Sequence, residues 1–293
     1  MIVKPRQYVS INDALAMIGL ELVIDGEDVD VCNAVGDSVM TKELQDWQIV
    51  FAPNYNNICT LPERKFPIKN AQAEFLWYMS GDASANAIAK FMPNWSKFAN
   101  ENGNVNSNYG VYWRKYIPGI IDELKRDKMS RRAVLNIFHA GNAPFGKDTP
   151  CTMTLQFLIR KNASGKHQLN LICNMRSNDI WYGLSIDQFC NSLLHQLVHH
   201  SLLATYPDLE LGWYSHHAGS MHVYTSSSKG NATIDPALLV NMHNNHMNAQ
   251  NPGERFEIDE NVTFENFWET AAPNFETARF EHFKQIWANT QAN

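Results

Sequence analysis

The sequence lacks an excess of basic charge: 30 acidic residues outnumber 24 lysines and arginines, and the formal net charge is −6. A protein that binds polymeric nucleic acid needs a basic surface, so this balance argues against a DNA- or RNA-binding function. A small anion held by a few arginines remains compatible with it. The five cysteines include no Cys-x-x-Cys pair, and their odd number argues against a disulfide framework or a zinc site.

Long apolar runs and glycine-rich loops are also missing. No stretch approaches the roughly 18 apolar residues that cross a bilayer, and residues 1–6 lack the apolar core of a signal peptide. No Walker loop, GxGxxG loop or internal repeat is present. His195 and His199 stand four apart, but neither a Glu directly after His195 nor a third ligand accompanies them. We therefore expect a cytoplasmic protein with reduced thiols, no bound metal and no membrane partner.

What the chain does have is enough apolar sequence for a large core, with 44% hydrophobic and 18% charged residues. Hydrophobic spacing and turn residues predict a mixed α/β protein. No linker divides the sequence, so we predict one domain over residues 1–293. The expected helices are one that begins after Ser10, then 69–80, 117–127 and 185–204, and the tail 264–287 repeats aromatic residues at helical spacing. The expected strands are 133–138, one after Cys151, 168–175, 209–214 and 219–224, and we expect 45–68 to be irregular.

Cys151 is the first candidate functional residue. Pro150 precedes it, and an apolar, β-branched run with a polar amide at Gln156 follows. This order predicts a thiol presented at the start of a strand, where a rigid scaffold can aim a nucleophile. The alternative is a buried structural cysteine, and only the accompanying polar motifs favour the nucleophile.

Those motifs follow one another in a fixed order. They are Glu74-x-Leu76-Trp77 with Gly81-Asp82, Trp95, Tyr109-Gly110, Ser130-Arg131-Arg132, Pro150-Cys151, Gln156-Phe157, Arg176-Ser177-x-Asp179, Gly183 and Gly219-x-x-His222-x-Tyr224. Together they resemble the thymidylate synthase superfamily over residues 70 to 226. The segments 106–110 and 175–179 look most like the deoxycytidylate (dCMP) hydroxymethylases of bacteriophages.

The resemblance implies a thymidylate synthase-like fold, in which helices flank a large mixed sheet and two copies pair through the sheet face. Residues 1–68 would form a divergent N-terminal part and residues 262–293 a helical tail. The implied co-substrate is 5,10-methylenetetrahydrofolate, and the implied partner is a pyrimidine nucleotide. The implied catalytic residues are Cys151 as nucleophile, Glu74 and Tyr109 in proton transfer, and Asp187 at the base. Substrate contacts would come from Arg131, Arg132, Gln156, Arg176, Ser177, His222 and Tyr224, and co-substrate contacts from Trp95, Asp179 and Gly183.

Two departures from the synthases bear on the substrate. Thr152 follows the cysteine where synthases have histidine, and Asp187 stands where their base-reading amide would sit. A protonated Asp187 can accept from N4 of cytosine and donate to N3, and an ionised one can pair with N3-protonated cytosine. The bland alternative is an Asp that caps a helix.

We therefore expect hydroxymethylation of dCMP. Two alternatives stay open, namely reductive methylation of dCMP or dUMP and an inactive nucleotide- or RNA-binding homologue. The N-terminal phosphate contact stays unassigned between Arg64 and Lys65.

Overall fold

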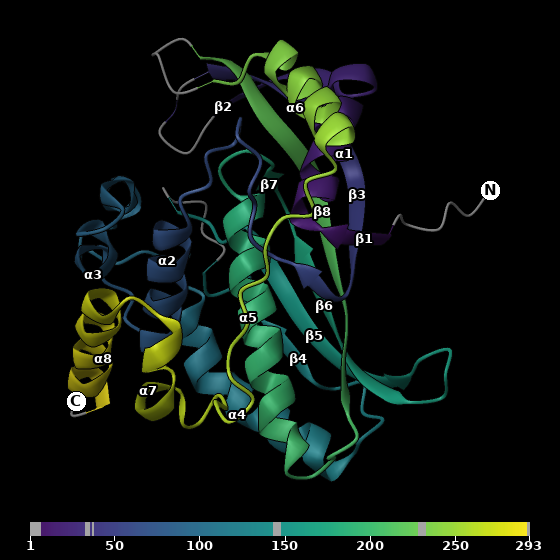
Figure 1. Ribbon diagram of the computed structural model, residues 1–293. Helices are drawn as coiled ribbons and strands as arrows, with labels where there is room; N and C mark the ends of the chain where they lie inside the picture. Colours follow the sequence, from purple (N-terminus) through teal and green to yellow (C-terminus); the bar gives the residue numbers. More distant parts are fainter. Residues whose placement is uncertain (1–6, 33–35, 37, 143–147, 228–232, 292–293) are drawn as a thin grey trace. The chain divides into compact units, whose positions relative to one another are not determined.

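The computed structural model describes residues 7–32, 36, 38–142, 148–227 and 233–291 (Figure 1). The chain separates into two compact units, each described here by itself. Unit 1 comprises Met1–Phe66, Asn174–Phe189 and Trp213–Phe256, and unit 2 comprises Pro67–Cys173, Cys190–Gly212 and Glu257–Asn293. The ends of the predicted N-terminal part and helical tail, residues 1–6 and 292–293, lie outside the described residues.

Unit 1 contains a helix that begins where the sequence predicts. The side chain of Ser10 accepts hydrogen bonds from the backbone N–H groups of Asn12 and Asp13, at 2.9 and 3.2 Å, and caps α1 (Ile11–Ile24). One face of α1 is buried, and α1 lies beside α6 (Pro236–Ala249) and β3 (Ser38–Asn56) in the same unit (Figure 1).

The strands of unit 1 correct two expectations. Residues 45–56 are not irregular, because β3 pairs antiparallel with β8 (Glu210–Ser227), from Val39–Ser227 to Phe51–Tyr214. Within 45–56, the irregularity is confined to points such as Asn54, whose φ of 59° lies where the register with β1 (Gln7–Ser10) shifts. Residues 57–67 form no helix or strand beyond a single bridge at Ile58, as expected. β2 (Glu27–Cys32) pairs with β3, and β7 (Asn178–Asp179) runs parallel to β8.

The two short strands expected at 209–214 and 219–224 are one strand, β8. Gly212 and Gly219 both lie within this strand, each at a close approach to another chain segment. A Cβ on Gly212 would come within 2.1 Å of Asn170 Oδ1, and one on Gly219 within 3.0 Å of the Arg176 carbonyl oxygen. These glycines therefore make room for a neighbouring chain segment.

Unit 2 is built on an aromatic helical core. The helix α2 (Ile68–Ser80) ends at Gly81, whose φ is 67°. Its Phe75 ring is 5.8 Å from Phe267 in α7 (Phe267–Thr270) and 5.9 Å from Phe275. Helices α4 (Gly110–Arg126) and α8 (Thr277–Gln291) also pack on α2 (Figure 1). The predicted helical tail thus packs within unit 2, where α8 also contacts η2 (Ala272–Asn274). The short helices α3 (Ala85–Ala89) and η1 (Pro93–Phe98) contact each other in the same unit, and α3 also contacts α2.

The strand order in unit 2 is β6-β5-β4. β4 (Val134–Asn136) pairs antiparallel with β5 (Thr152–Lys161), and β6 (His167–Met175) continues into unit 1 after Cys173. The helix α5 (Leu184–Leu203) likewise contributes residues to both units. The predicted mixed α/β class, a large mixed sheet flanked by helices, is confirmed. Within the described ranges, no helix is both long and apolar enough to span a membrane.

Replacement of Ser10 by alanine should lower the free energy of unfolding by about 1 kcal/mol, because two N–H groups at the start of α1 lose their acceptor. Ser84 is a matched control, since it precedes α3 without a capping hydrogen bond from its side chain. Ser84→Ala should change stability by less than about 0.5 kcal/mol. Urea unfolding of both variants measures the difference, and equal losses would contradict the capping role.

Candidate functional site

The predicted site residues are divided between the two units. Unit 2 carries Glu74, Trp95, Tyr109, Arg131, Arg132, Cys151 and Gln156, and unit 1 carries Arg176, Ser177, Asp179, Gly183, Asp187, His222 and Tyr224. Each half is described on its own.

Cys151 directly precedes β5, as the sequence predicts, and its side chain is half-buried. The next residue, Thr152, donates its backbone N–H to the hydroxyl of Tyr109 at 3.3 Å. Tyr109 stands at the start of α4, so this hydrogen bond ties the cysteine turn to a helix end. The structure thus brings two of the predicted catalytic residues, Cys151 and Tyr109, into one local arrangement.

The segment before Cys151 is fixed by Asp148, to which the sequence analysis gave no role. Its carboxylate accepts the backbone N–H of Ser107 at 2.7 Å and also the Ser107 hydroxyl, and its carbonyl accepts from Asn106 Nδ2 at 3.0 Å. The dense polar run 106–108 was the available signal, because short polar side chains commonly hold loops through backbone groups.

Glu74 lies on α2 and is buried, with 5% of its surface exposed, although a glutamate on a helix is more often exposed to solvent. The Tyr78 hydroxyl, one turn later, donates to Glu74 Oε1 at 2.7 Å. The Tyr78 ring lies 5.3 Å from the Tyr109 ring. Glu74, Tyr78 and Tyr109 therefore form a continuous buried set that leads to the backbone beside Cys151.

Trp95 packs its ring 5.1 Å from Trp77, which follows Glu74 on α2. Gln156 Nε2 donates to the carbonyl of Arg131, in the segment before β4, at 3.1 Å. These contacts are structural, and the predicted ligand contacts of Trp95 and Gln156 stay predictions.

Arg131 and Arg132 are exposed, and Glu123 organises the turn that carries them. Glu123 accepts from the Ser130 hydroxyl at 2.5 Å and from Arg132 Nε at 2.9 Å, and it also pairs with Arg126. The Ser130 hydrogen bond, followed by those from the two arginines, lowers the pKa of Glu123 to about 2. Glu123 is thus an acceptor throughout the physiological range, and it holds the double-arginine turn in place.

In unit 1, β7 places the predicted Asp179 beside His222. β7 and β8 run parallel with Asp179 opposite His222, and the His222 ring lies 5.1 Å from the Tyr224 ring. Burial raises the pKa of Asp179, and the nearby His222 opposes that rise. Asp179 Oδ2 is buried and has no hydrogen-bond partner among the residues that the structure describes. A buried acceptor without a donor is a ready contact for a ligand N–H.

The segment Arg176-Ser177 leads into β7. Arg176 has an exposed side chain, and its carbonyl accepts the Ser220 N–H of β8 at 3.2 Å. Ser177 is half-buried. Their backbone is therefore anchored to β8, while the contacts predicted for their side chains stay predictions.

Asp187 lies in the first turn of α5 and is half-buried. Its Oδ2 accepts from Asn178 Nδ2 at 2.6 Å. Burial raises the pKa of Asp187 to about 7, against the lowering effect of the Asn178 hydrogen bond, and Asp179 adds to the rise. This carboxyl can therefore hold or release a proton near neutral pH.

Gly183 explains how Asn178 and Asp187 come so close. A Cβ at position 183 would lie 3.0 Å from Asn178 Nδ2 and 3.1 Å from Asp187 Oδ2. The Gly183 N–H donates to the Asp179 carbonyl at 3.0 Å. The predicted co-substrate role of Gly183 stays a prediction, while its packing role is visible.

Arg64 is one of the two residues between which the sequence left a phosphate contact open. It is buried in unit 1, and its guanidinium lies 5.7 Å from both the Phe66 and Trp181 rings. Burial lowers the pKa of Arg64, and Asp179 acts in the opposite direction. Arg64 therefore belongs to the charged environment of Asp179.

His195 is engaged otherwise than in a metal site, since its Nε2 contacts the Leu169 carbonyl at 2.9 Å. His199 Nε2 likewise contacts the Leu209 carbonyl at 2.8 Å. Over the ranges that the structure describes, no three His, Cys, Asp or Glu side chains converge in a way that would hold a metal.

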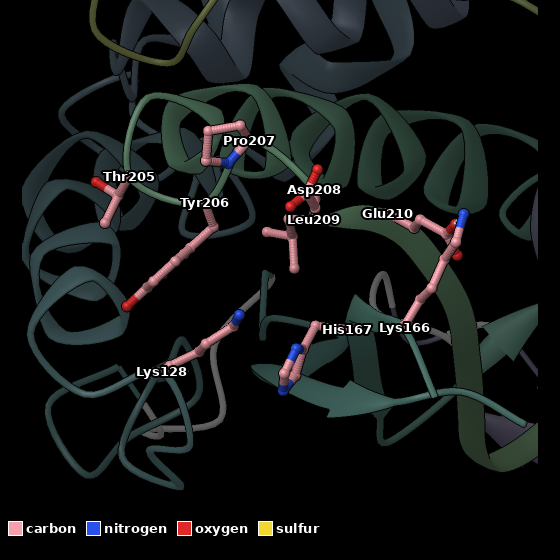
Figure 2. A pocket seen from close by; sticks show the side chains of 9 residues that line it. All are labelled: Lys128, Lys166, His167, Thr205, Tyr206, Pro207, Asp208, Leu209 and Glu210. Carbon is pink, nitrogen blue, oxygen red and sulfur yellow. The ribbon is translucent and has the colours of Figure 1, made fainter. Parts of the chain in front are cut away.

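Unit 2 also has an open pocket of about 680 Å³ near the end of α5 (Figure 2). Lys166 pairs with Glu210 there at 2.7 Å, and Lys128 lies 4.7 Å from the Tyr206 ring centre. The remaining lining residues are His167, Thr205, Pro207, Asp208 and Leu209. None of the predicted site residues lines it, and its charges balance.

Comparison with known proteins gives a consistent result. A family model described as thymidylate synthase matches residues 27–289. A thymidylate synthase of Haloferax volcanii is 26% identical over 215 residues, which span 64% of this chain and 60% of that protein's length. A solved structure, the thermostable thymidylate synthase A from Bacillus subtilis, has a TM-score of 0.57 and 21% identity, and the match covers 73% of this chain and 80% of that one. This last likeness supports the fold alone.

The raised pKa of Asp187 predicts a pH-dependent stability. Between its ordinary pKa of 3.8 and the raised value of about 7, the folded chain keeps a proton that the unfolded chain releases. Stability therefore falls as pH rises through this window. Asp187→Asn removes the titration, so the variant should gain stability relative to the unmodified chain between pH 5 and pH 8. Urea unfolding at both values measures the gain, and a pH-independent difference would contradict it.

Proposed function

Because the chain belongs to the thymidylate synthase family, we propose that it transfers a one-carbon unit from 5,10-methylenetetrahydrofolate to C5 of dCMP. Addition of water would then give 5-hydroxymethyl-dCMP and tetrahydrofolate. The protein would act in the cytoplasm, as do the phage hydroxymethylases it resembles. The observation that carries the cytosine assignment is the half-buried Asp187, held by Asn178 and able to keep a proton near neutral pH.

The residues of unit 2 would carry the covalent chemistry. The Cys151 thiolate adds to C6 of the pyrimidine, and C5 becomes nucleophilic and accepts the one-carbon unit. Tyr109 assists removal of the C5 proton, and loss of that proton eliminates tetrahydrofolate and leaves an exocyclic methylene on C5. Glu74, acting through ordered water, manages the proton and activates the water that adds to this methylene, and the bond between Cys151 and C6 then breaks to release the product. The contact of Tyr109 with the backbone beside Cys151 and the burial of Glu74 support these roles.

The phosphate and sugar would be held mainly by residues of unit 1. Arg176 and Ser177 bind the phosphate. His222 and Tyr224, whose rings are in contact, bind the 3′-hydroxyl of the sugar. Exposed Arg131 and Arg132 reach the phosphate of the other subunit's nucleotide, so activity would require a homodimer.

Asp179 fits the folate co-substrate, because its buried Oδ2 lacks a donor within the described part of the chain and a pterin ring offers N–H groups. Trp95 and Gly183 would line the same co-substrate. When bound, the folate supplies the one-carbon unit, and the chain's residues orient it and manage the protons.

Asp187 would read the base. Cytosine offers an N4 donor and an N3 acceptor, so a protonated carboxyl complements both groups. Uracil reverses the pattern and would leave a buried polar group unpaired. That penalty weakens the binding of uracil relative to cytosine. Thr152, in place of the histidine of the synthases, favours water over hydride as the final addition.

Reductive methylation, as in the synthases themselves, is the second candidate, and the named relatives favour it. Analysis of the products formed from dCMP and from dUMP with methylenetetrahydrofolate separates the two. We expect 5-hydroxymethyl-dCMP and tetrahydrofolate. A methylated product accompanied by dihydrofolate would overturn the hydroxymethylase assignment.

Cys151→Ala should abolish release of tritium from C5 of labelled dCMP while nucleotide binding persists, because only the nucleophile is removed. Cys190→Ala is the control, since that buried cysteine lies on α5 and packs against Ala71. The control should retain exchange. Absence of exchange in the unmodified chain with every pyrimidine nucleotide would point to an inactive binding homologue.

Asp187→Asn should shift the preference from dCMP toward dUMP by at least about tenfold, the effect of one mismatched buried hydrogen bond. The ratio of kcat/KM for tritium release from the two nucleotides measures it. If that ratio stays constant, Asp187 does not read the base.

A further inference from the structure

Unit 1 contains a chain of hydrogen bonds that ends on Asp187. Tyr214 Oη lies 2.6 Å from His216 Nδ1, and His216 Nε2 lies 3.2 Å from Asn178 Oδ1. Asn178 Nδ2 lies 2.6 Å from Asp187 Oδ2. We propose that Tyr214 and His216 are positioning residues that fix the orientation of the Asn178 amide and so decide which oxygen of Asp187 carries its proton. This inference rests on the proposed function for its link to base selection.

The direction of each hydrogen bond follows from the partners. His216 is fully buried, and burial lowers its pKa to about 3, so the ring is neutral and has one N–H. Asn178 Oδ1 can only accept, so the hydrogen is on Nε2. Nδ1 is then an acceptor and takes the Tyr214 hydroxyl hydrogen. The amide nitrogen of Asn178 is left to donate to Asp187 Oδ2.

The consequence appears at the carboxyl. An oxygen that accepts from Asn178 is a poor place for the proton, so a protonated Asp187 carries it on Oδ1. That O–H stays available for an acceptor such as N3 of cytosine. With the amide reversed, Asn178 would present its oxygen to Asp187. That oxygen would then accept the hydrogen bond from the Asp187 O–H group. The relay therefore keeps the donor of Asp187 free for the base.

Other charged groups around the relay act on its members from outside. Asp179 on β7 raises the pKa of Asp187, and Asp179 itself faces His222 and Arg64. His217, the neighbour of His216 on β8, lowers the pKa of His216 further. These groups set the pH range, whereas the relay sets the direction of the hydrogen bonds.

Tyr214→Phe is the sharpest variant, because it removes one oxygen from the start of the relay. Without that hydroxyl, Nδ1 of His216 loses its donor, and the ring can place its hydrogen on either nitrogen. Tyr55→Phe is the matched control: Tyr55 is also buried in unit 1, donates to Gln188 Oε1 at 2.7 Å and takes no part in the relay.

Nuclear magnetic resonance of the free protein tests the relay without any substrate. Nitrogen shifts should show the hydrogen of His216 on Nε2, and in Tyr214→Phe a share should move to Nδ1. The carbon titration of the Asp187 carboxyl should move to higher pH in the variant, since the Asn178 donor that lowers its pKa is lost from part of the population. Tyr55→Phe should leave both signals unchanged.

A second variant keeps the inference falsifiable if Tyr214→Phe folds poorly. His216→Gln retains an N–H near the position of Nε2 and should keep the Asp187 titration near its original pH, whereas His216→Phe should shift it upward. A hydrogen on Nδ1 in the unmodified chain, or an Asp187 titration that neither Tyr214→Phe nor His216→Phe alters, would overturn the proposal.

The preference for dCMP over dUMP then distinguishes a failure of this inference from a failure of the proposed function. In Tyr214→Phe, the dCMP-to-dUMP ratio of kcat/KM for tritium release should fall by about tenfold, the upper end of the effect expected of one neutral hydrogen bond. Failure of the unmodified chain to release tritium would refute the function and leave the resonance result to judge the relay. An unchanged ratio alongside shifted resonances would overturn the link between the relay and the base.

Discussion

The hydrogen bond between Asn178 and Asp187 joins β7 to the first turn of α5 and is the contact on which the proposed base reading depends. Burial makes the carboxyl group of Asp187 costly to ionise and raises its pKa, so its surroundings decide its protonation. Here the amide of Asn178 lies 2.6 Å away and the absence of a side chain at Gly183 permits that approach. β7 fixes Asn178 by pairing with β8, and α5 carries Asp187. One polar contact thus unites a strand, a helix and a glycine.

In unit 2, hydroxyl groups make the corresponding polar contacts around a buried carboxyl group. Glu74 is buried and receives the Tyr78 hydroxyl, and Tyr109 accepts the N–H beside Cys151. Neutral donors satisfy a buried acid without fixing its charge, which suits a group proposed to move protons. The rings of Tyr78 and Tyr109 also form part of the aromatic core, so the same residues supply stability and polar contacts.

The sequence was sufficient for features that depend on neighbouring residues. Ser10 caps α1, Gly81 ends α2 and Cys151 precedes β5, because capping and turn chemistry act over a few positions. It failed where distant segments decide. Residues 45–56 form a strand because β8 pairs with them, and Gly212 and Gly219 are close approaches to other segments. Family order located Asp187 and Asp179, but no local pattern singled out Tyr214, His216 or Asp148.

This contrast separates residues that local sequence identifies from residues that only the folded structure identifies. A nucleophile is recognised by its neighbours in sequence, whereas the selectivity of a carboxyl depends on which way a buried amide points. Asn178 is symmetrical in shape but not in hydrogen bonding, so a neutral His216 with its hydrogen on Nε2 is enough to choose between two outcomes at Asp187. Under the proposed function, base preference would therefore be a property of the hydrogen-bond network. An Asp in place of the synthases' base-reading Asn would read cytosine well only where that network holds the amide of Asn178 in one orientation.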